Sequence, residues 1–424
     1  MKVSIIGLGY IGLPLSIEFS KIYEVIAYDQ DSKRVEQLKN FEDKSGEVDK
    51  NLFAESKNIT FTNESNLLRD SDFFIVCVPT PINQDNQPDL GHIQSASELV
   101  GRSLTKNKKS IIVYESTVYP GVTEDFCVPI IEKNSNLKFN KEFFCGYSPE
   151  RINPGDKTRR LPDIVKVVSA STQETLEKVN DLYSSIIPAG TFKASSIKVA
   201  EAAKVIENAQ RDLNIAFFNE LSQLFKKLNI ESNDVIEAAS TKWNFINFKP
   251  GLVGGHCIGV DPYYLTHIAK ENGIEPKVIL SGRSTNDSMH EFVAESLFQE
   301  LLQKNKILSD CEVLILGATF KENCSDLRNS KSIELASFIS KSVKKVKIYD
   351  PEVELDDLEN AISKLNNVTS SDAVKISQSD AIILAVSHDK LADVASSIQK
   401  ERTQDQIVFD LQNFLPKEIS DWRL

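Results

Sequence analysis

Short apolar runs alternate with longer stretches of helical spacing over the first 195 residues of the chain. The runs, rich in β-branched residues, lie at 3–6, 24–28, 73–78, 110–114 and 164–168. This alternation is typical of a doubly wound α/β domain, in which each strand is followed by a helix. We therefore predict such a domain over residues 1–195.

A different pattern occupies residues 196–228. Apolar residues recur there at intervals of three and four, and the stretch contains neither glycine nor proline, which predicts one helix. A helix of that length spans about 45 to 50 Å, more than one small domain can cover. We expect it to join two domains and to provide the surface of a homodimer. Helical spacing continues to about residue 305, interrupted by a loop at 243–262.

Strand-like runs return in the last third of the chain. They lie at 312–316, 345–349, 381–386 and 406–410. Asp350 follows one of them as Asp29 follows a run near the N-terminus. The pattern predicts two Rossmann-like doubly wound domains joined by a long central helix and a helical middle domain. The predicted boundaries are 1–195, 196–305 and 306–424.

The amino-acid composition limits the class of protein and the kinds of molecule it can bind. With 41% hydrophobic and 26% charged residues, the 424-residue chain has the composition of a soluble globular protein. The net charge of −12 disfavours the binding of nucleic acid, although local sites can still bind a small anion.

We find no apolar run of the roughly 20 residues that a membrane span needs, and no basic leader, so we expect a cytoplasmic protein. The six cysteines have no CxxC spacing, which indicates neither disulfides nor a metal site.

A glycine-rich turn follows the first predicted strand. Gly7, Gly9 and Gly12 have the spacing that makes the tight turn, admits a pyrophosphate and packs helix against strand in a dinucleotide fold. Asp29 ends the second strand, where a carboxylate accepts from ribose hydroxyls and favours NAD over NADP. Further cofactor contacts are predicted at Tyr10, Ile11 and Arg34.

Two threonines follow later strands of the same domain. Thr80 and Thr117 belong to loops at the carboxyl edge, where open α/β sheets bind ligands. We expect both beside the nicotinamide. For Thr80, a hydroxyl that only caps its turn explains the sequence equally well.

The loop around Cys257 is the best candidate for the reacting centre. Glycines surround this cysteine and Asp261 follows four residues later, a close-approach setting that a packed thiol does not need. Lys204 and Asn208 share one face of the predicted long helix. They could hold an oxyanion, although a solvated helix face has the same spacing. His256 adjoins the thiol, and we interpret it as a packing residue.

Seven segments, in order along the chain, carry a family resemblance. They are GLGYIGLPL, CVPTPIN, ESTVYPG, SPERINPGD, KVAEAAKVIEN, KWNFINFKPGLVGGHCIGVDPYYLT and GATFKENCSDLRNSK. Together they resemble the UDP-glucose/GDP-mannose dehydrogenase family, in particular the branch that oxidises UDP-N-acetylhexosamines. The resemblance covers residues 1 to about 420.

The resemblance implies a four-electron oxidation of the sugar C6 alcohol to a carboxylate with two NAD+. Cys257 matches the catalytic thiol, which would form a thiohemiacetal and then a thioester that water hydrolyses. Lys204 and Asn208 would stabilise the oxyanions, and Asp261 would relay protons. 

The same resemblance assigns the positioning of water to Thr117 and Glu150. It leaves open which of Lys204, Asp261 and Glu150 is the general base.

The resemblance also implies contacts with the UDP-sugar. The matching residues are Glu150, Arg151, Lys204, Asn208, Lys249, Gly254 and Lys321. Arg328 matches a residue near the cofactor pyrophosphate. At Lys249 the family usually carries arginine, and lysine keeps the charge without the bidentate fork, which puts that contact in doubt.

The leading hypothesis is a UDP-N-acetylglucosamine 6-dehydrogenase that supplies the uronate for a surface polysaccharide such as capsule or O-antigen. The galactosamine epimer is the first alternative, since no motif decides the C4 hydroxyl. UDP-N-acetylmannosamine and UDP-glucose are less favoured. Two further alternatives are a non-enzymatic nucleotide-sugar scaffold and a two-electron dehydrogenase whose activity survives Cys257→Ala.

Overall fold

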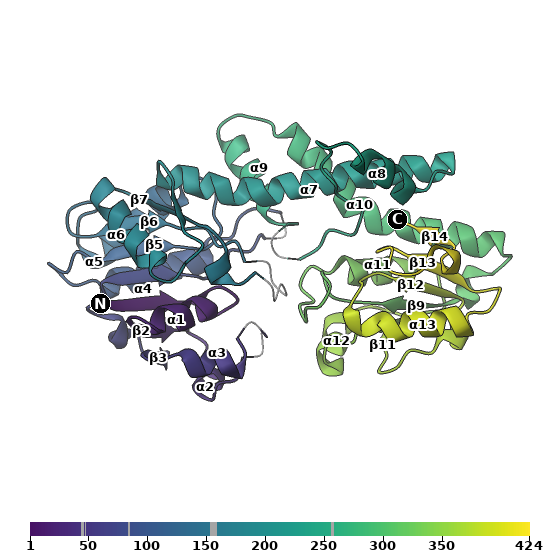
Figure 1. The fold of residues 1–424 in the computed structure, drawn as a ribbon, viewed down its shortest axis with the longest axis horizontal. Helices are drawn as coiled ribbons and strands as arrows, with labels where there is room; N and C mark the ends of the chain where they lie inside the picture. The colour runs from purple at the N-terminus through teal and green to yellow at the C-terminus, as the bar shows by residue number, and fades with distance from the viewer. Residues whose placement is uncertain (44–45, 47, 84, 153–158, 256–257) are drawn as a thin grey trace. The chain divides into compact units, whose positions relative to one another are not determined.

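The computed structural model describes residues 1–43, 46, 48–83, 85–152, 159–255 and 258–424 (Figure 1). The chain divides into two compact units. Unit 1 comprises residues 1–207 and 263–275, and unit 2 comprises residues 208–262 and 276–424. The division into 1–195, 196–305 and 306–424 stays a prediction.

Unit 1 contains an eight-stranded sheet with the order β3-β2-β1-β4-β5-β6-β7-β8. Its strands are β1 Lys2–Ile6, β2 Glu24–Tyr28, β3 Ile59–Thr62, β4 Phe73–Val76, β5 Ile111–Tyr114, β6 Phe144–Tyr147, β7 Lys166–Ala170 and β8 Thr191–Lys193. Neighbouring strands are parallel except β6 and β7, which are antiparallel. The predicted doubly wound architecture is confirmed.

Helices cover both faces of this sheet. They are α1 Gly12–Ser20, α2 Ser32–Lys39, α3 Lys50–Glu55, α4 Gly91–Ser103, α5 Val128–Ser135 and α6 Gln173–Ser184. In β4, Ile75 packs into one hydrophobic cluster, and Phe74 and Val76 into another. Because successive side chains of a strand point to opposite faces, the two clusters are the two sides of the sheet. This explains why the central strands are continuous apolar runs.

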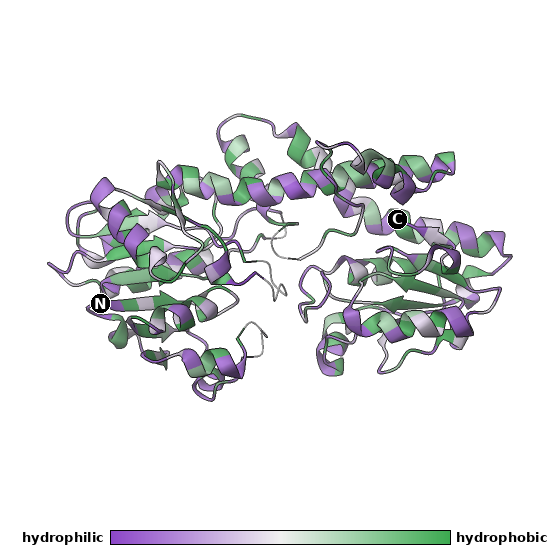
Figure 2. Ribbon diagram, in the orientation of Figure 1, coloured by the Kyte–Doolittle hydropathy of each residue, from purple (hydrophilic) through white to green (hydrophobic). Residues whose placement is uncertain are grey.

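Unit 2 contains a six-stranded parallel sheet with the order β11-β10-β9-β12-β13-β14. The strands are β9 Glu312–Leu316, β10 Lys345–Tyr349, β11 Val368–Ser370, β12 Ala381–Leu384, β13 Ile407–Asp410 and β14 Trp422–Arg423, with helices α11 Lys331–Ile339, α12 Leu355–Ile362 and α13 Ala392–Glu401. Figure 2 shows apolar residues concentrated on the strands of both sheets.

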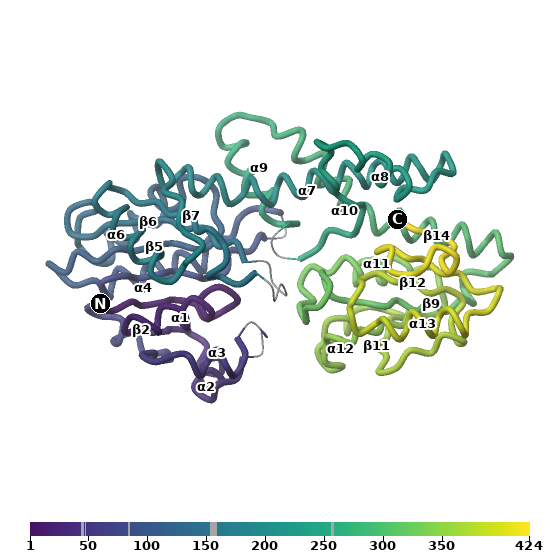
Figure 3. Tube along the Cα trace, in the orientation of Figure 1, coloured from purple at the N-terminus to yellow at the C-terminus, as the bar shows by residue number. Residues whose placement is uncertain are grey.

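The predicted long helix is confirmed as α7, Ile197–Leu228, which Figure 3 traces without interruption. The helical region continues with α8 Ser232–Ser240, α9 Asp261–Glu271 and α10 Lys277–Gln303. Within unit 2, Arg283 of α10 pairs with Asp212 of α7 at 2.5 Å. A Cβ at Gly282 would lie 2.5 Å from Leu213 Cδ2, so any other residue there would force the Leu213 side chain to shift.

Every strand predicted from the pattern exists, with ends shifted by a few residues at most. The pattern misses β3, β6, β8, β11 and β14, which have two to four residues each. Periodicity over so few positions does not distinguish a strand from a loop. None of the helices in the described ranges is long and apolar enough to cross a membrane.

Candidate functional site

The glycine-rich turn lies between β1 and α1 in unit 1. Gly7 has φ +94°, and a Cβ there would lie 2.7 Å from Cys77 O. A Cβ at Gly12 would lie 1.8 Å from Gly7 O, so the chain's own packing requires both glycines. A Cβ at Gly9 would meet no described atom within 4 Å. Gly9 therefore leaves open space beside the backbone, which fits the pyrophosphate of NAD.

Two predicted cofactor residues hold this turn in place. Asp29 Oδ2 accepts from Leu8 N at 2.8 Å, and Arg34 Nε donates to Leu8 O at 3.0 Å. Each Asp29 oxygen accepts one amide, because Oδ1 binds Asp31 N at 2.9 Å. A carboxylate has about four acceptor positions, so Asp29 retains acceptors for ribose hydroxyls. Tyr10 and Ile11, also predicted, are half-buried in the turn.

The two predicted threonines are in contact with each other. Thr80 Oγ1 donates to Thr117 O at 2.6 Å, and Tyr264 OH donates to Thr80 O at 2.5 Å. The hydroxyl of Thr80 thus links the loops that follow β4 and β5, which supports the structural interpretation of this residue. Contacts of either threonine with a cofactor stay a prediction.

Glu150 follows β6 and belongs to a buried ionic cluster that sequence reasoning missed. Lys166 Nζ lies 2.9 Å from Glu150 Oε2 and 2.6 Å from Glu115 Oε2. Burial raises the pKa of Glu150. The charge of Lys166, its hydrogen bond and the hydrogen bonds from two backbone amides lower this pKa by more, so the net shift is downward. The available signal was a lysine inside a run predicted as a buried strand.

Two further predicted residues lie on or beside the part of α7 in unit 1. Arg151 forms an ion pair with Glu207, at 2.7 Å from Nη2 to Oε1. The Lys204 ammonium has no hydrogen-bond or ion-pair partner among the described residues. An amine without a protein partner is available to an anionic group of a substrate.

In unit 2 the structure brings together two predicted residues that are 53 positions apart. Asn208 Nδ2 donates to Asp261 Oδ2 at 2.5 Å. Asp261 is 2% exposed and begins α9. Cys257 and His256, which precede it, lie outside the described residues.

The glycines before Cys257 pack against the segment that carries Lys321 and Arg328. Gly255 N donates to Asn329 O, and Asn329 Nδ2 donates to Gly255 O, both at 3.2 Å. A Cβ at Gly254 would lie 2.5 Å from Asn329 O, and one at Gly255 would lie 2.5 Å from the Phe320 ring. The close approach expected at these glycines is therefore to another segment of the same chain, at Phe320 and Asn329.

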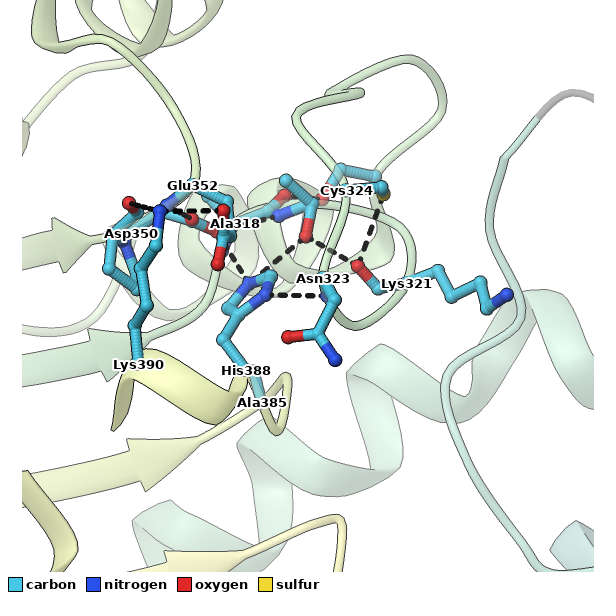
Figure 4. A network of polar contacts seen from close by, with 12 residues as sticks. Ala318, Lys321, Asn323, Cys324, Asp350, Glu352, Ala385, His388 and Lys390 are labelled. Carbon is cyan, nitrogen blue, oxygen red and sulfur yellow. Dashed lines mark hydrogen bonds and ion pairs between the residues drawn. The ribbon is translucent and has the colours of Figure 1, made fainter. Parts of the chain in front are cut away.

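A buried histidine and an aspartate organise the loop after β9. Asp350 Oδ2 accepts from Ala318 N at 2.6 Å and lies 3.1 Å from His388 Nε2 (Figure 4). Burial raises the pKa of Asp350, but the hydrogen bonds from His388 and the amides outweigh it, so the net shift is downward. Asp350 thus occupies in unit 2 the position that Asp29 occupies in unit 1.

The same histidine fixes the turn that contains Lys321. Asn323 N donates to His388 Nδ1 at 3.0 Å, so Nδ1 is the acceptor and Nε2 carries the ring proton. Thr319 Oγ1 donates to Lys321 O at 2.8 Å. Figure 4 shows the side chain of Lys321 directed away from this network. The hydrogen bonds to Lys321 O therefore hold the backbone of this residue.

Arg328 and Lys249 are the remaining predicted residues. The guanidinium of Arg328 hydrogen-bonds both carboxylate oxygens of Asp326, at 2.6 to 3.1 Å. Lys249 is exposed. Their roles stay predictions.

The chain is similar to known proteins over its whole length. Residues 1–187, 198–288 and 314–417 match the NAD binding, central and UDP binding domains of the UDP-glucose/GDP-mannose dehydrogenase family. The chain is 48% identical to a UDP-N-acetyl-D-glucosamine 6-dehydrogenase of Salmonella typhi, over 100% of this chain and 99% of the relative. It is 47% identical to Protein CapL of Staphylococcus aureus, with the same coverage.

A solved structure shares the whole fold. The UDP-D-ManNAc dehydrogenase of Pyrococcus horikoshii has a TM-score of 0.88 and 29% identity, over 100% of this chain and 98% of that one. Sequence, domain order and fold agree, and the chain belongs to the UDP-glucose/GDP-mannose dehydrogenase family.

Proposed function

We propose that the protein oxidises C6 of UDP-N-acetyl-D-glucosamine to the carboxylate and reduces two NAD+. The observation that carries this proposal is the full-length similarity, at 48% and 47% identity, to two proteins named UDP-N-acetyl-D-glucosamine 6-dehydrogenase. NAD supplies the hydride acceptor when bound. The open space at Gly9 and the acceptors of Asp29 support its placement at the turn after β1.

Cys257 is the nucleophile of this proposal. Its thiolate adds to C6 of the aldehyde and forms a C–S bond, and oxidation of this thiohemiacetal gives a thioester. Water then attacks the thioester carbon, the C–S bond breaks, and the products are the carboxylate, the thiolate and two protons. The thiol keeps the reactive aldehyde bound between the two oxidations.

The other side chains act on charge and protons. Lys204 offers a cation, and Asn208 a donor, to the oxygen that becomes negative at C6. Asp261, hydrogen-bonded to Asn208 at 2.5 Å, is the candidate for relaying protons. Glu150, whose pKa is lowered, is a weak base and accepts a hydrogen bond from water.

The proposed assembly is a homodimer through α7. Five large apolar side chains of this helix are 48% to 59% exposed: Val199, Ile206, Phe217, Leu224 and Leu228. Their separations of 7, 11, 7 and 4 residues return to nearly the same side of a helix with 3.6 residues per turn. An apolar stripe of this length requires cover from a partner.

A second substrate has one observation in its favour. The solved structure with a TM-score of 0.88 is described as a UDP-D-ManNAc dehydrogenase. The lower identity of 29% ranks this C2 epimer below the glucosamine sugar. The galactosamine epimer also stays an alternative, because one hydrogen bond can decide the C4 orientation.

The test is the NADH yield per mole of limiting sugar nucleotide at excess NAD+. UDP-N-acetylglucosamine, UDP-N-acetylgalactosamine, UDP-N-acetylmannosamine and UDP-glucose are compared in parallel. We expect a yield of about two with the first sugar and the highest kcat/KM with it. A yield of about one would remove the thioester step, and no NADH with any of the four would contradict the proposal as a whole.

A matched variant checks the thiol. Cys257→Ala is expected to release at most one NADH per sugar, while Cys324→Ala, a half-buried thiol elsewhere, keeps the yield of the parent. Two NADH per sugar in Cys257→Ala would remove the thioester step, and one NADH per sugar in both parent and variant would favour the two-electron alternative.

A further inference from the structure

A buried ionic cluster lies at the carboxyl edge of the unit 1 sheet. Lys166 is 2% exposed and Glu115 is 0% exposed, and their charged atoms are 2.6 Å apart. Glu150, 5% exposed, is the second carboxylate on the same ammonium, at 2.9 Å. The Tyr183 hydroxyl donates to Glu115. Apolar residues of similar volume often stabilise a fold equally well, so stability alone does not explain this cluster.

Strand direction brings the three charged groups together. Glu115 follows β5 and Glu150 follows β6, and these strands are parallel. β7 is antiparallel to β6, with Tyr147 opposite Ser169. The first residue of β7, Lys166, therefore lies at the edge where β5 and β6 end. A parallel β7 would have placed this lysine at the opposite edge.

The hydrogen bonds of Glu150 fix its carboxylate in one orientation. Oε1 accepts from the backbone N–H groups of Arg151 and Ile152, both at 2.6 Å. Oε2 accepts from Lys166. Three of the roughly four acceptor positions of a carboxylate are thus used by described residues. The fourth belongs to Oε2, the oxygen that Lys166 also binds.

We propose that Lys166 is a positioning residue that keeps Glu150 ionised and holds its carboxylate in one orientation, with one acceptor position left for a water of the proposed reaction. This inference rests on the proposed function. Lys166 itself does not touch the substrate. Its contribution is electrostatic, since an ammonium at hydrogen-bond distance in a buried site favours the charged form of a carboxylate.

Competition between the two carboxylates supports this assignment. Burial raises the pKa of Glu115 to about 6, against the opposing effect of Lys166 and with the help of Glu150. The pKa of Glu150 is shifted downward. Cys77 and Tyr183 are the other titratable groups near the cluster, and burial raises the pKa of both. Glu115 is therefore the member that takes up a proton, and Glu150 keeps its charge.

The test replaces Lys166 by methionine, whose unbranched side chain is one atom shorter and carries no charge. We expect kcat at pH 7 to fall at least tenfold and KM for the sugar nucleotide to change less than threefold. We also expect kcat to gain an acidic limb, because without the ammonium of Lys166 burial raises the pKa of Glu150. The control is Lys108→Met, in which the same substitution breaks an ion pair with Asp72 in the same unit.

A second readout is independent of turnover. The side-chain 13C resonance of Glu150, assigned by its loss in Glu150→Gln, is expected not to titrate above pH 5 in the parent and to titrate in Lys166→Met. This readout separates failure of the inference from failure of the proposed function. Where Lys166→Met does not fold, Glu115→Gln/Lys166→Met, which removes one charge of each sign, takes its place. A folded variant with the parent's pH profile and an unshifted Glu150 resonance overturns the inference, as does lost activity without either change.

Discussion

Asn208 in α7 donates a hydrogen bond from Nδ2 to Oδ2 of Asp261, the first residue of α9, at 2.5 Å. Both were expected near the reacting centre, and the structure shows that their side chains are hydrogen-bonded to each other. The amide N–H of Asn208 therefore fixes the orientation of the Asp261 carboxyl group.

Asn208→Asp tests this pair, because it places two carboxylates within hydrogen-bond distance. One of them must then hold a proton near neutral pH, and the substrate loses a donor. We expect kcat to fall about a hundredfold at pH 8, the lower limit of typical acid–base contributions, and less at pH 6. Asn214→Asp on the same helix is the control, and equal losses in both variants would contradict a specific role.

Replacing the glycines of the turn after β1 is expected to cause two different defects, a loss of stability at Gly12 and a loss of NAD+ affinity at Gly9. In Gly12→Ala the new Cβ would lie 1.8 Å from Gly7 O, so we expect a loss of several degrees in Tm. In Gly9→Ala no described atom is within 4 Å of the Cβ, so Tm stays within about 2 °C, while the dissociation constant of NAD+ rises at least tenfold. Calorimetric titration and thermal unfolding separate these outcomes. Normal NAD+ binding in Gly9→Ala would place the pyrophosphate elsewhere.

Because His388 and Asp350 are in contact in unit 2, we expect the stability of this unit to fall at acidic pH. Because the folded pKa of Asp350 is lowered, its contribution to stability is present above the unfolded pKa and is lost as pH falls through the folded value. His388→Ala leaves the carboxylate without one buried partner, which costs about 1 to 3 kcal/mol. Urea unfolding of parent and variant between pH 3 and 7 measures this. A difference that does not shrink toward pH 3 would rule out the linkage.

The raised pKa of Glu115 predicts the opposite dependence of the free energy of unfolding on pH. Its pKa rises from 4.5 to about 6 on folding, so the folded state binds more protons than the unfolded state in that interval. The contribution of Glu115 to the free energy of unfolding therefore falls as pH rises from 4.5 to 6, by about 2 kcal/mol at 1.4 kcal/mol per pH unit. Glu115→Gln is expected to remove this component, whereas the exposed Glu220→Gln retains it. Unfolding curves at pH 4.5 and 6.5 provide the comparison.

The apolar stripe of α7 predicts the assembly. Ile206→Glu/Phe217→Glu puts two charges on side chains that are 53% and 59% exposed and should yield a monomer at micromolar concentration in sedimentation velocity. Arg211→Glu, roughly a third of a turn away on the same helix, is expected to remain a dimer. A dimer in all three proteins would place the interface elsewhere.

The sequence by itself determined the repeating elements and the identity of the chemistry. The alternation of apolar runs predicted the strands, the uninterrupted helical spacing over 196–228 predicted α7, and the motifs indicated the family. These features are set by residues that are close together in the sequence, so the sequence pattern is enough to predict them. The glycine turn was also predictable, since its spacing follows from the backbone alone.

Only the tertiary structure decided which side chains meet. The direction of β7 put Lys166 beside Glu115 and Glu150, and a strand pattern has no direction. The partnership of Asn208 with Asp261 spans 53 positions, and that of His388 with Asp350 spans 38. Contacts at such separations depend on strand order and helix packing, which arise from burying the whole chain and not from any local segment.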